Sequence, residues 1–283
     1  MADAVSGERN RDQTSPSSIL STTNNNAADQ DGQGVVKPGV LNCKTVYLIR
    51  HAETEENVKA NNLRRAGRNI QQFKLPKGSD LRDGGAFLAM CLQGKTDAHI
   101  SSHGREQICQ MREILKESSF LETNNISVIA HSPLRRARET CRGMLGAAAD
   151  GQDGSQVGEL LEHVGKADDW TLPNPVKQVA ELECLREVTP WENTVGGKSN
   201  FRQRVQTFEN WLCQHSEDNI AVVGHSEYFM YLLGLPRSQK FKNCDVWKVK
   251  ISMDAGEDGL RQGFATHDWT QLQLLHRLPC FLG

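Results

Sequence analysis

The sequence predicts an α/β fold, a three-layer α/β/α sandwich around a mostly parallel central sheet. Three short apolar runs rich in β-branched residues have the character of buried strands, and they lie at 45–49, 126–130 and 220–223. Segments with helical spacing follow or separate these runs. Strands that alternate with amphipathic helices are typical of a sheet whose neighbouring strands run parallel and whose two faces are both covered by helices.

The helices are predicted from apolar residues that recur every three or four positions. The first helix should begin after Gly104, the second after Pro133 and the third after Gly197. Their apolar faces comprise Ile108, Met111 and Leu115 in the first, Leu134, Ala137, Cys141 and Met144 or Leu145 in the second, and Val205, Phe208 and Leu212 in the third.

The first 40 residues differ in composition from the rest of the chain. They are rich in Ser, Thr, Asn, Asp, Gln and Gly, and they contain almost no large apolar side chains. Such a segment cannot bury enough apolar surface to offset the entropy of ordering. We therefore expect residues 1–40 to form a disordered tail, and residues 41–283 to form one folded domain.

Overall charge and cysteine spacing exclude several classes of protein. The net charge of −2 favours neither nucleic acid nor membrane as a partner, and no apolar stretch reaches the ~20 residues of a membrane span. The first residues lack the apolar core of a secretory signal. The eight cysteines include no C-x-x-C pair, which argues against a zinc site or a disulfide scaffold. We expect a cytoplasmic protein with reduced thiols.

Residues 58–90 form a long basic excursion that contains a proline and several glycines. It is compatible with a cap over a binding site and equally with a solvated loop. A cap of this charge would favour a ligand with additional negative charge.

Each of the three predicted strands ends in a histidine, and these are His51, His131 and His225. In open α/β sheets, ligands bind at the carboxyl ends of the strands, so the three loops should converge. Two arginines, Arg50 and Arg136, belong to the same loops. Several cations and hydrogen-bond donors that face one point are what a phosphoryl group requires.

Six segments resemble, in order, the motifs of the histidine phosphatase superfamily, which includes the cofactor-dependent phosphoglycerate mutases. Residues 50–57 resemble its R-H-G-E-[ST]-x-x-N signature, with Ala52 in place of the glycine. The other similar segments lie at 92–107, 132–140, 185–187, 196–205 and 223–225. They are spread over roughly residues 45–235, which is most of the folded chain, and the resemblance identifies 41–283 as a histidine phosphatase domain.

The resemblance implies a role for each matching residue. His51 would attack phosphorus and carry it transiently, and Glu187 would act as the general acid and base. The implied ligands of the phosphoryl group or substrate are Arg50, Arg136, His225, Asn57, Gln93 and Gly94. Glu183 and Glu192 remain alternatives for the acid, and Arg135 remains an alternative to Arg136. His131 is expected to have a structural or supporting role.

The resemblance predicts a metal-independent phosphatase without a cofactor, acting on a small phosphate ester or, alternatively, on a phosphoprotein. Phosphoglycerate mutases carry R-H-Y-G after the acid, whereas Glu187 is followed by the residues V-T-P-W, so water is the expected acceptor. A mutase and a catalytically weak phospho-ligand or protein-binding module remain alternatives. The substrate and the oligomeric state cannot be read from the sequence.

Overall fold

The computed structural model describes residues 43–62, 97–146, 172–189, 191–194, 196–252 and 264–279. The expected tail at 1–40, most of the excursion at 58–90, and the candidate residues Gln93 and Gly94 lie outside these ranges. The predictions made for them are therefore not tested by the structure.

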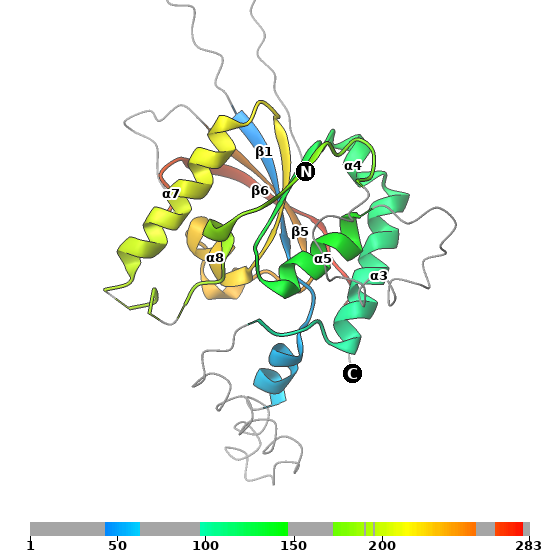
Figure 1. The fold of residues 1–283 in the computed structure, drawn as a ribbon, viewed down its shortest axis with the longest axis horizontal. Coiled ribbons are helices and arrows are strands. Elements are labelled where there is room, and N and C mark those ends of the chain that lie inside the picture. Colours follow the sequence, from blue (N-terminus) through cyan, green and yellow to red (C-terminus); the bar gives the residue numbers. More distant parts are fainter. Residues whose placement is uncertain are drawn as a thin grey trace, which may run out of the picture. The chain divides into compact units, whose positions relative to one another are not determined.

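A six-stranded sheet in the order β3-β2-β4-β1-β5-β6 forms the centre of the molecule (Figure 1). Its strands are β1 (Cys43–Arg50), β2 (Val128–His131), β3 (Gln178–Glu181), β4 (Asn219–Gly224), β5 (Val246–Ser252) and β6 (Asp268–His276). The pairs β3–β2, β2–β4 and β4–β1 are parallel, whereas β1–β5 and β5–β6 are antiparallel. The prediction of a mostly parallel sheet is confirmed.

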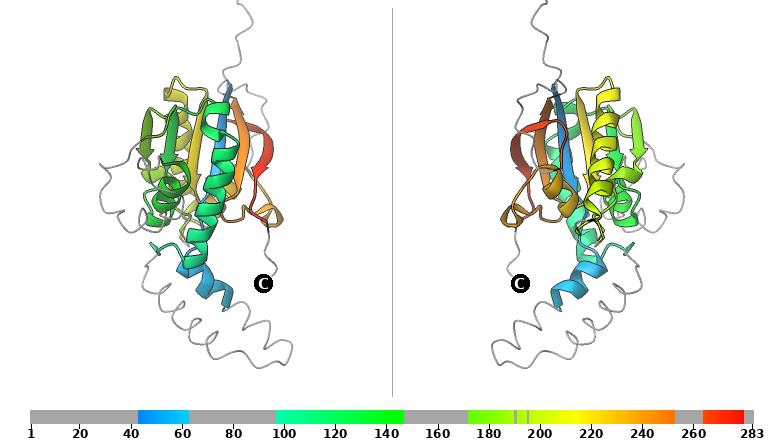
Figure 2. Two further views of the ribbon diagram at one scale, coloured as in Figure 1. Left: turned by 90° about the vertical axis from the view of Figure 1, so that its right-hand side faces the viewer. Right: turned by 90° about the vertical axis from the view of Figure 1, so that its left-hand side faces the viewer.

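Helices cover both faces of this sheet, which confirms the three-layer architecture. On one face lie α7 (Lys198–Gln214) and α8 (Ser226–Leu232), and on the other lie α3 (Ser102–Glu117), α4 (Phe120–Thr123) and α5 (Arg135–Leu145). Figure 2 looks onto the two faces of the sheet, with the strands side by side across each view and helices in front of them. The described residues also include two short 3-10 helices, η3 (Glu183–Leu185) and η4 (Arg237–Gln239), and a helical stretch at 55–62.

The residues of β1 show why the sheet is covered on both sides. Val46 and Leu48 belong to the apolar cluster under α7 and α8, whereas Tyr47 and Ile49 belong to the cluster under α3 and α5. All four side chains are at most 1% exposed. Because successive side chains of a strand point to opposite faces, a strand buried on both faces reads as a continuous apolar run.

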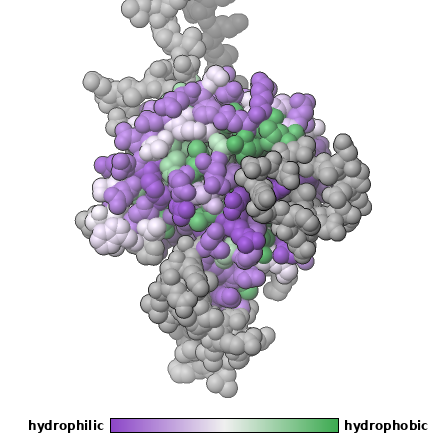
Figure 3. All heavy atoms as spheres, viewed as in Figure 1, coloured by the Kyte–Doolittle hydropathy of each residue, from purple (hydrophilic) through white to green (hydrophobic). Residues whose placement is uncertain are grey.

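One face of the molecule is mainly polar. On the face drawn in Figure 3, hydrophilic residues predominate and hydrophobic ones form smaller groups between them. No helix within the described ranges combines the length and the apolar character needed to cross a bilayer.

The register of the parallel strands brings their carboxyl ends to one edge of the sheet. Arg50 at the end of β1 pairs with Gly224 at the end of β4, and His131 at the end of β2 pairs with Val223. The residues that follow these strands therefore lie beside one another, as the sequence predicts.

Candidate active site

His51 follows β1 and is 3% exposed. Its Nδ1 lies 2.7 Å from the carbonyl oxygen of Ala52. A carbonyl oxygen can only accept a hydrogen bond, so Nδ1 carries the proton and Nε2 keeps its lone pair. Burial lowers the pKa of His51 well below its usual value, and the charges of Arg136 and Arg50 lower it further. His51 is thus neutral at physiological pH, as a nucleophile requires.

His225 follows β4 and is fully buried, with its ring centroid 5.2 Å from that of His51. Its Nε2 lies 2.8 Å from the hydroxyl of Ser132, which also accepts the N–H of Leu134 at 3.3 Å. The hydroxyl proton is therefore available to His225 Nε2, and the imidazole proton then resides on Nδ1. Burial, with the charge of Arg136 next, holds the pKa of His225 well below its usual value.

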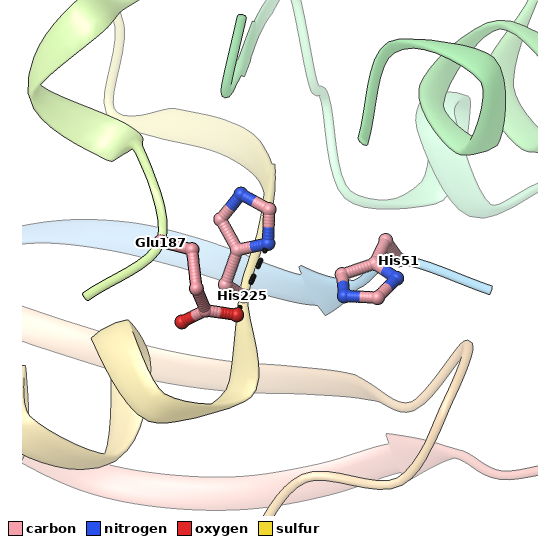
Figure 4. A group of neighbouring side chains, drawn as sticks. All are labelled: His51, Glu187 and His225. Carbon is pink, nitrogen blue, oxygen red and sulfur yellow. Dashed lines mark ion pairs between the residues drawn. The ribbon is translucent and has the colours of Figure 1, made fainter. Parts of the chain in front are cut away.

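Glu187 projects toward His225 from the segment after η3 (Figure 4). Its Oε2 lies 3.4 Å from Nδ1 of His225 and 3.9 Å from Nη2 of Arg136. Burial raises the pKa of Glu187 to about 7, and the charge of Arg136 only partly opposes this shift. A carboxyl group with this pKa is protonated in a large fraction of molecules near neutral pH, as a general acid must be.

The other two acidic candidates are bound elsewhere. The Glu183 side chain is 72% exposed and pairs with Arg186. Glu192 receives two hydrogen bonds of 2.8 Å from Arg204. Burial favours the neutral form of Glu192, but the hydrogen bonds from Arg204 and Thr189 hold its pKa below the usual value. Of the three, only Glu187 combines a raised pKa with contacts to His225 and Arg136.

Two arginines flank the histidines, the partly buried Arg50 and the buried Arg136. Arg50 donates through Nη1 to the carbonyl of Phe241 at 2.7 Å, while its buried Nε has no hydrogen-bond partner among the described residues. Arg136 is 5% exposed in the first turn of α5. Its neighbour Arg135 is turned to Glu139, with Nε and the carboxylate oxygen 2.6 Å apart. The geometry therefore favours Arg136 over Arg135 as the ligand.

The segment after His51 is held by α3. The Glu53 N–H donates to Oε1 of Gln107 at 2.9 Å, and the Glu53 carbonyl accepts the N–H of Ser101 at 3.0 Å. A Cβ added to Gly104 would lie 2.1 Å from that carbonyl oxygen. The similarity at 92–107 thus includes residues that support the loop of His51 rather than touch a ligand.

Helix α5 is fixed to the same loop. The hydroxyl of Thr140 accepts the N–H of Ala52 at 2.9 Å and donates to the carbonyl of Arg136 at 2.7 Å. Asp97 accepts the N–H of Arg135 at 2.6 Å, at the first residue of α5. The carboxylate of Asp97 therefore satisfies an N–H that the helix itself leaves free.

The turn before β5 adds a contact that the sequence does not indicate. Asn243 donates through Nδ2 to the carbonyl of His51 at 2.9 Å. The buried Asp245 accepts the N–H of Arg50 on its carbonyl at 3.2 Å, and its carboxylate binds Arg277 at 2.5 and 2.7 Å. No motif marks Asn243, because its role depends on the antiparallel pairing of β5 with β1.

Asn57 has a different contact from the one expected. Its Oδ1 accepts the N–H of Thr54 at 3.2 Å, and its own N–H donates to the Thr54 hydroxyl at 3.2 Å. This reciprocal pair caps the helical residues 55–62. These contacts join Asn57 to Thr54 and not to the histidines, and its role as a phosphate ligand stays a prediction.

His131 is buried, with Nδ1 2.9 Å from the carbonyl of Ser132. Burial lowers its pKa. It stands beside the site through Ser132, in keeping with the supporting role expected for it.

One atom each of His51, Glu187 and His225 could meet at a metal ion, because these atoms lie within 4.8 Å of one another. The guanidinium of Arg136 is 3.9 Å from the carboxylate of Glu187, and Arg50 is close enough to lower the pKa of His51. These cations oppose a second positive charge at the same point. The donor set suits an anion better than a divalent metal.

Comparison with known proteins identifies the family. The model of the histidine phosphatase superfamily (branch 1) matches residues 87–253, a span that includes Arg136, Glu187 and His225 and begins after His51. A "Phosphoglycerate mutase-like protein" of Arabidopsis thaliana is 23% identical over 265 residues, which are 82% of this chain and 88% of that protein.

Two solved structures are also similar. One is an Escherichia coli protein provisionally described as an alpha-ribazole-5'-P phosphatase, with 18% identity, a TM-score of 0.45, and 83% of this chain and 96% of that chain covered. The other is a mycobacterial glucosyl-3-phosphoglycerate phosphatase, with 15% identity, a TM-score of 0.39, and 82% and 97% covered. On the strength of the family match, this chain belongs to the histidine phosphatase superfamily.

Proposed function

We propose that this protein is a metal-independent phosphatase that hydrolyses a phosphate monoester through a phosphohistidine on His51. The observation that carries the proposal is a neutral, buried histidine beside two donor atoms that make no hydrogen bond among the described residues, although Nδ1 of His225 lies 3.4 Å from Oε2 of Glu187. Nδ1 of His225 and Nε of Arg50 are buried without hydrogen-bond partners among the described residues. Buried donors that lack partners are costly unless a ligand supplies acceptors, and a phosphoryl group supplies several.

In the first step, Nε2 of His51 forms a bond to phosphorus while the bond from phosphorus to the ester oxygen breaks. Glu187 gives its proton to that oxygen, so the leaving group departs as an alcohol. The oxygens of the transferring group accept hydrogen bonds from Arg50, Arg136 and His225, whose fixed positions stabilise the charge without reorganisation.

In the second step, the ionised Glu187 takes a proton from water as the water oxygen attacks phosphorus. The bond between His51 and phosphorus breaks, inorganic phosphate leaves, and Glu187 is protonated again. A carboxyl group with a pKa of about 7 can serve in both directions near neutral pH, since both of its protonation states are populated.

Water is proposed as the acceptor because the residues after Glu187 offer no obvious clamp for a second anionic substrate. Val188 is 6% exposed, and Thr189 uses both its N–H and its hydroxyl to bind Glu192. We propose a small-molecule phosphate ester as substrate, a cytoplasmic location, and a catalytic domain that spans 41–283. A phosphoprotein substrate is the alternative, and neither nucleic acid nor a membrane is proposed as a partner.

The decisive experiment measures phosphate release from a panel of phosphorylated metabolites and phosphopeptides in the presence of EDTA. Turnover should persist with EDTA, vanadate should inhibit it, and His51→Ala should abolish it. His99→Ala is the matched control, because His99 is an exposed histidine that contributes a backbone carbonyl to Glu55. An absolute requirement for a divalent metal, or full activity of His51→Ala, would overturn the proposal.

A further inference from the structure

We infer that Arg204 is a positioning residue for the general acid: its guanidinium organises the segment that carries Glu187. This inference rests on the proposed function, because it concerns the acid of that reaction. Arg204 lies in α7 and reaches the segment 184–192, which is distant in sequence.

The guanidinium of Arg204 makes four hydrogen bonds to this segment. Nε and Nη2 bind the two carboxylate oxygens of Glu192, each at 2.8 Å. Nη1 binds the carbonyl of Cys184 at 3.1 Å and that of Arg186 at 2.7 Å. A two-pronged pair with a carboxylate fixes orientation as well as distance, which a lysine ammonium cannot do.

Aromatic rings fix the guanidinium from the side of the core. Its central carbon lies 5.2 Å from the ring centroid of Phe201 and 5.7 Å from that of Tyr228. Both rings are at most 1% exposed and belong to α7 and α8. The position of Arg204 is therefore set by the packed core, and the segment 184–192 takes its position from Arg204.

Glu187 lies between the two groups that Arg204 holds. The bound carbonyl of Arg186 belongs to the peptide bond that joins it to Glu187. On the other side, Oε2 of Glu192 accepts the N–H of Thr189 at 2.9 Å and its hydroxyl at 3.1 Å. The backbone is thus anchored one residue before Glu187 and two residues after it.

The Glu187 carboxyl itself has weaker contacts. It lies 3.2 Å from the N–H nitrogen of Val188, 3.4 Å from Nδ1 of His225 and 3.9 Å from Nη2 of Arg136. The backbone anchors must therefore supply most of its orientation. Because proton transfer depends steeply on geometry, a displacement of about 1 Å costs on the order of 10²-fold in rate.

A leaving-group test separates this role from a general effect on the fold. An alkyl phosphate needs its leaving oxygen protonated, whereas an aryl phosphate with an acidic phenol departs without help. Arg204→Lys keeps the positive charge and removes the planar guanidinium that binds both carboxylate oxygens of Glu192. We expect kcat/KM for an alkyl phosphate to fall about 10- to 100-fold, and kcat/KM for p-nitrophenyl phosphate to fall less than about 3-fold. The ratio kcat/KM is compared because it reports the steps up to departure of the leaving group, whereas kcat also includes the later hydrolysis in which Glu187 acts as base.

Two further variants guard against a folding artefact. Glu192→Gln keeps the side-chain shape and weakens the pair, so it should show the same selectivity with a smaller loss. Arg202→Gln is the matched control, because Arg202 is an exposed arginine in the same helix. It should leave both substrates unaffected.

A double-mutant cycle completes the test, in buffer free of phosphate. If Arg204 acts through Glu187, Arg204→Lys should cause no further loss on the alkyl phosphate in the Glu187→Gln background. Equal losses on both substrates, fully additive losses in the cycle, or no loss in Arg204→Lys and Glu192→Gln would overturn the inference. Failure of the proposed function would be distinct, because wild-type protein would then turn over neither ester.

Discussion

Nδ1 of His51 donates to the carbonyl oxygen of Ala52 across 2.7 Å, and this one contact decides which ring nitrogen of His51 keeps its lone pair. With Nδ1 protonated, only Nε2 has a lone pair for phosphorus. We therefore predict that a phosphoenzyme trapped from a rapid reaction by an alkaline denaturing quench carries phosphate on Nε2 of His51. Phosphorus NMR of the denatured adduct distinguishes the two isomers, and peptide mapping locates the residue.

The control is His51→Asn, which keeps a polar side chain but removes the ring. It should give no base-stable, acid-labile label, whereas His99→Ala should label like the wild type. Phosphate found on Nδ1, or on a residue other than His51, contradicts the assignment.

The raised pKa of Glu187 predicts a pH dependence. The acid must be protonated to assist departure of an alkyl leaving group, and its pKa in the free enzyme is about 7. For an alkyl phosphate, kcat/KM should thus fall about tenfold per pH unit above that value. Stopped assays between pH 6 and 9 measure the slope. Glu187→Gln should be slower by ~10²–10⁴-fold and lack this limb; a wild-type profile flat to pH 9 would exclude Glu187 as the acid.

The same shift predicts a change in stability. A carboxyl group whose pKa rises on folding favours the folded state most at low pH, and this contribution is lost as pH rises from about 4.5 to about 7. Glu187→Gln cannot ionise, so its free energy of unfolding relative to wild type should increase between pH 5 and pH 8, by at most roughly 3 kcal/mol. Urea unfolding in phosphate-free buffer measures it, and a pH-independent difference would contradict the raised pKa.

The contact between Ser132 and His225 predicts which ring nitrogen of His225 carries the proton. Its hydroxyl is 2.8 Å from Nε2 of His225, which leaves the imidazole proton on Nδ1, 3.4 Å from Glu187. Ser132→Ala should release this preference and lower kcat by about 10-fold, in keeping with the loss of one positioned donor. Nitrogen NMR of labelled histidines reads the tautomer directly. Ser132→Thr, which retains the hydroxyl, should preserve the spectrum if the bond is responsible.

Two glycines offer a matched pair for stability. A Cβ at Gly104 would meet the carbonyl oxygen of Glu53 at 2.1 Å, whereas a Cβ at Gly196 would touch Trp191 at 3.4 Å. Gly104→Ala should therefore destabilise the protein by about 2–4 kcal/mol and reduce activity, since Glu53 lies two residues after His51. Gly196→Ala should be close to neutral. Thermal unfolding of both variants measures this difference in stability. Similar melting temperatures would contradict the close approach of Gly104 to the carbonyl of Glu53.

The sequence was sufficient to predict the parallel half of the sheet and the edge where the site forms. The runs at 45–49 and 220–223 lie within β1 and β4, and the run at 126–130 overlaps β2, because strands buried on both faces need continuous apolar residues. Their histidines could then be assigned to one edge without tertiary information. The family motifs added Glu187, whose pKa depends on burial that a sequence does not reveal.

The antiparallel half was not predicted. Strands β5 and β6 contain lysine, glutamine and threonine among their apolar residues, so neither reads as a buried run. Asn243 could not be recognised for the same reason: it meets His51 only after β5 has paired with β1. Likewise, the choice of the general acid among Glu183, Glu187 and Glu192 could not be made from the sequence. It depended on Arg204, whose partners are 12 to 20 residues away in the sequence.

The ion pair of Arg277 with Asp245 gives the last described strand an influence on chemistry that it does not touch. Asp245 holds the backbone N–H of Arg50, and Arg277 follows directly after β6. A tag, protease cut or binding partner that disturbed residues near 277 would therefore affect Arg50, the proposed phosphate ligand, through the single intervening residue Asp245. A change near the end of β6 can therefore alter the reaction centre without contacting it. Fusions engineered near Arg277 should be checked for activity as well as for folding.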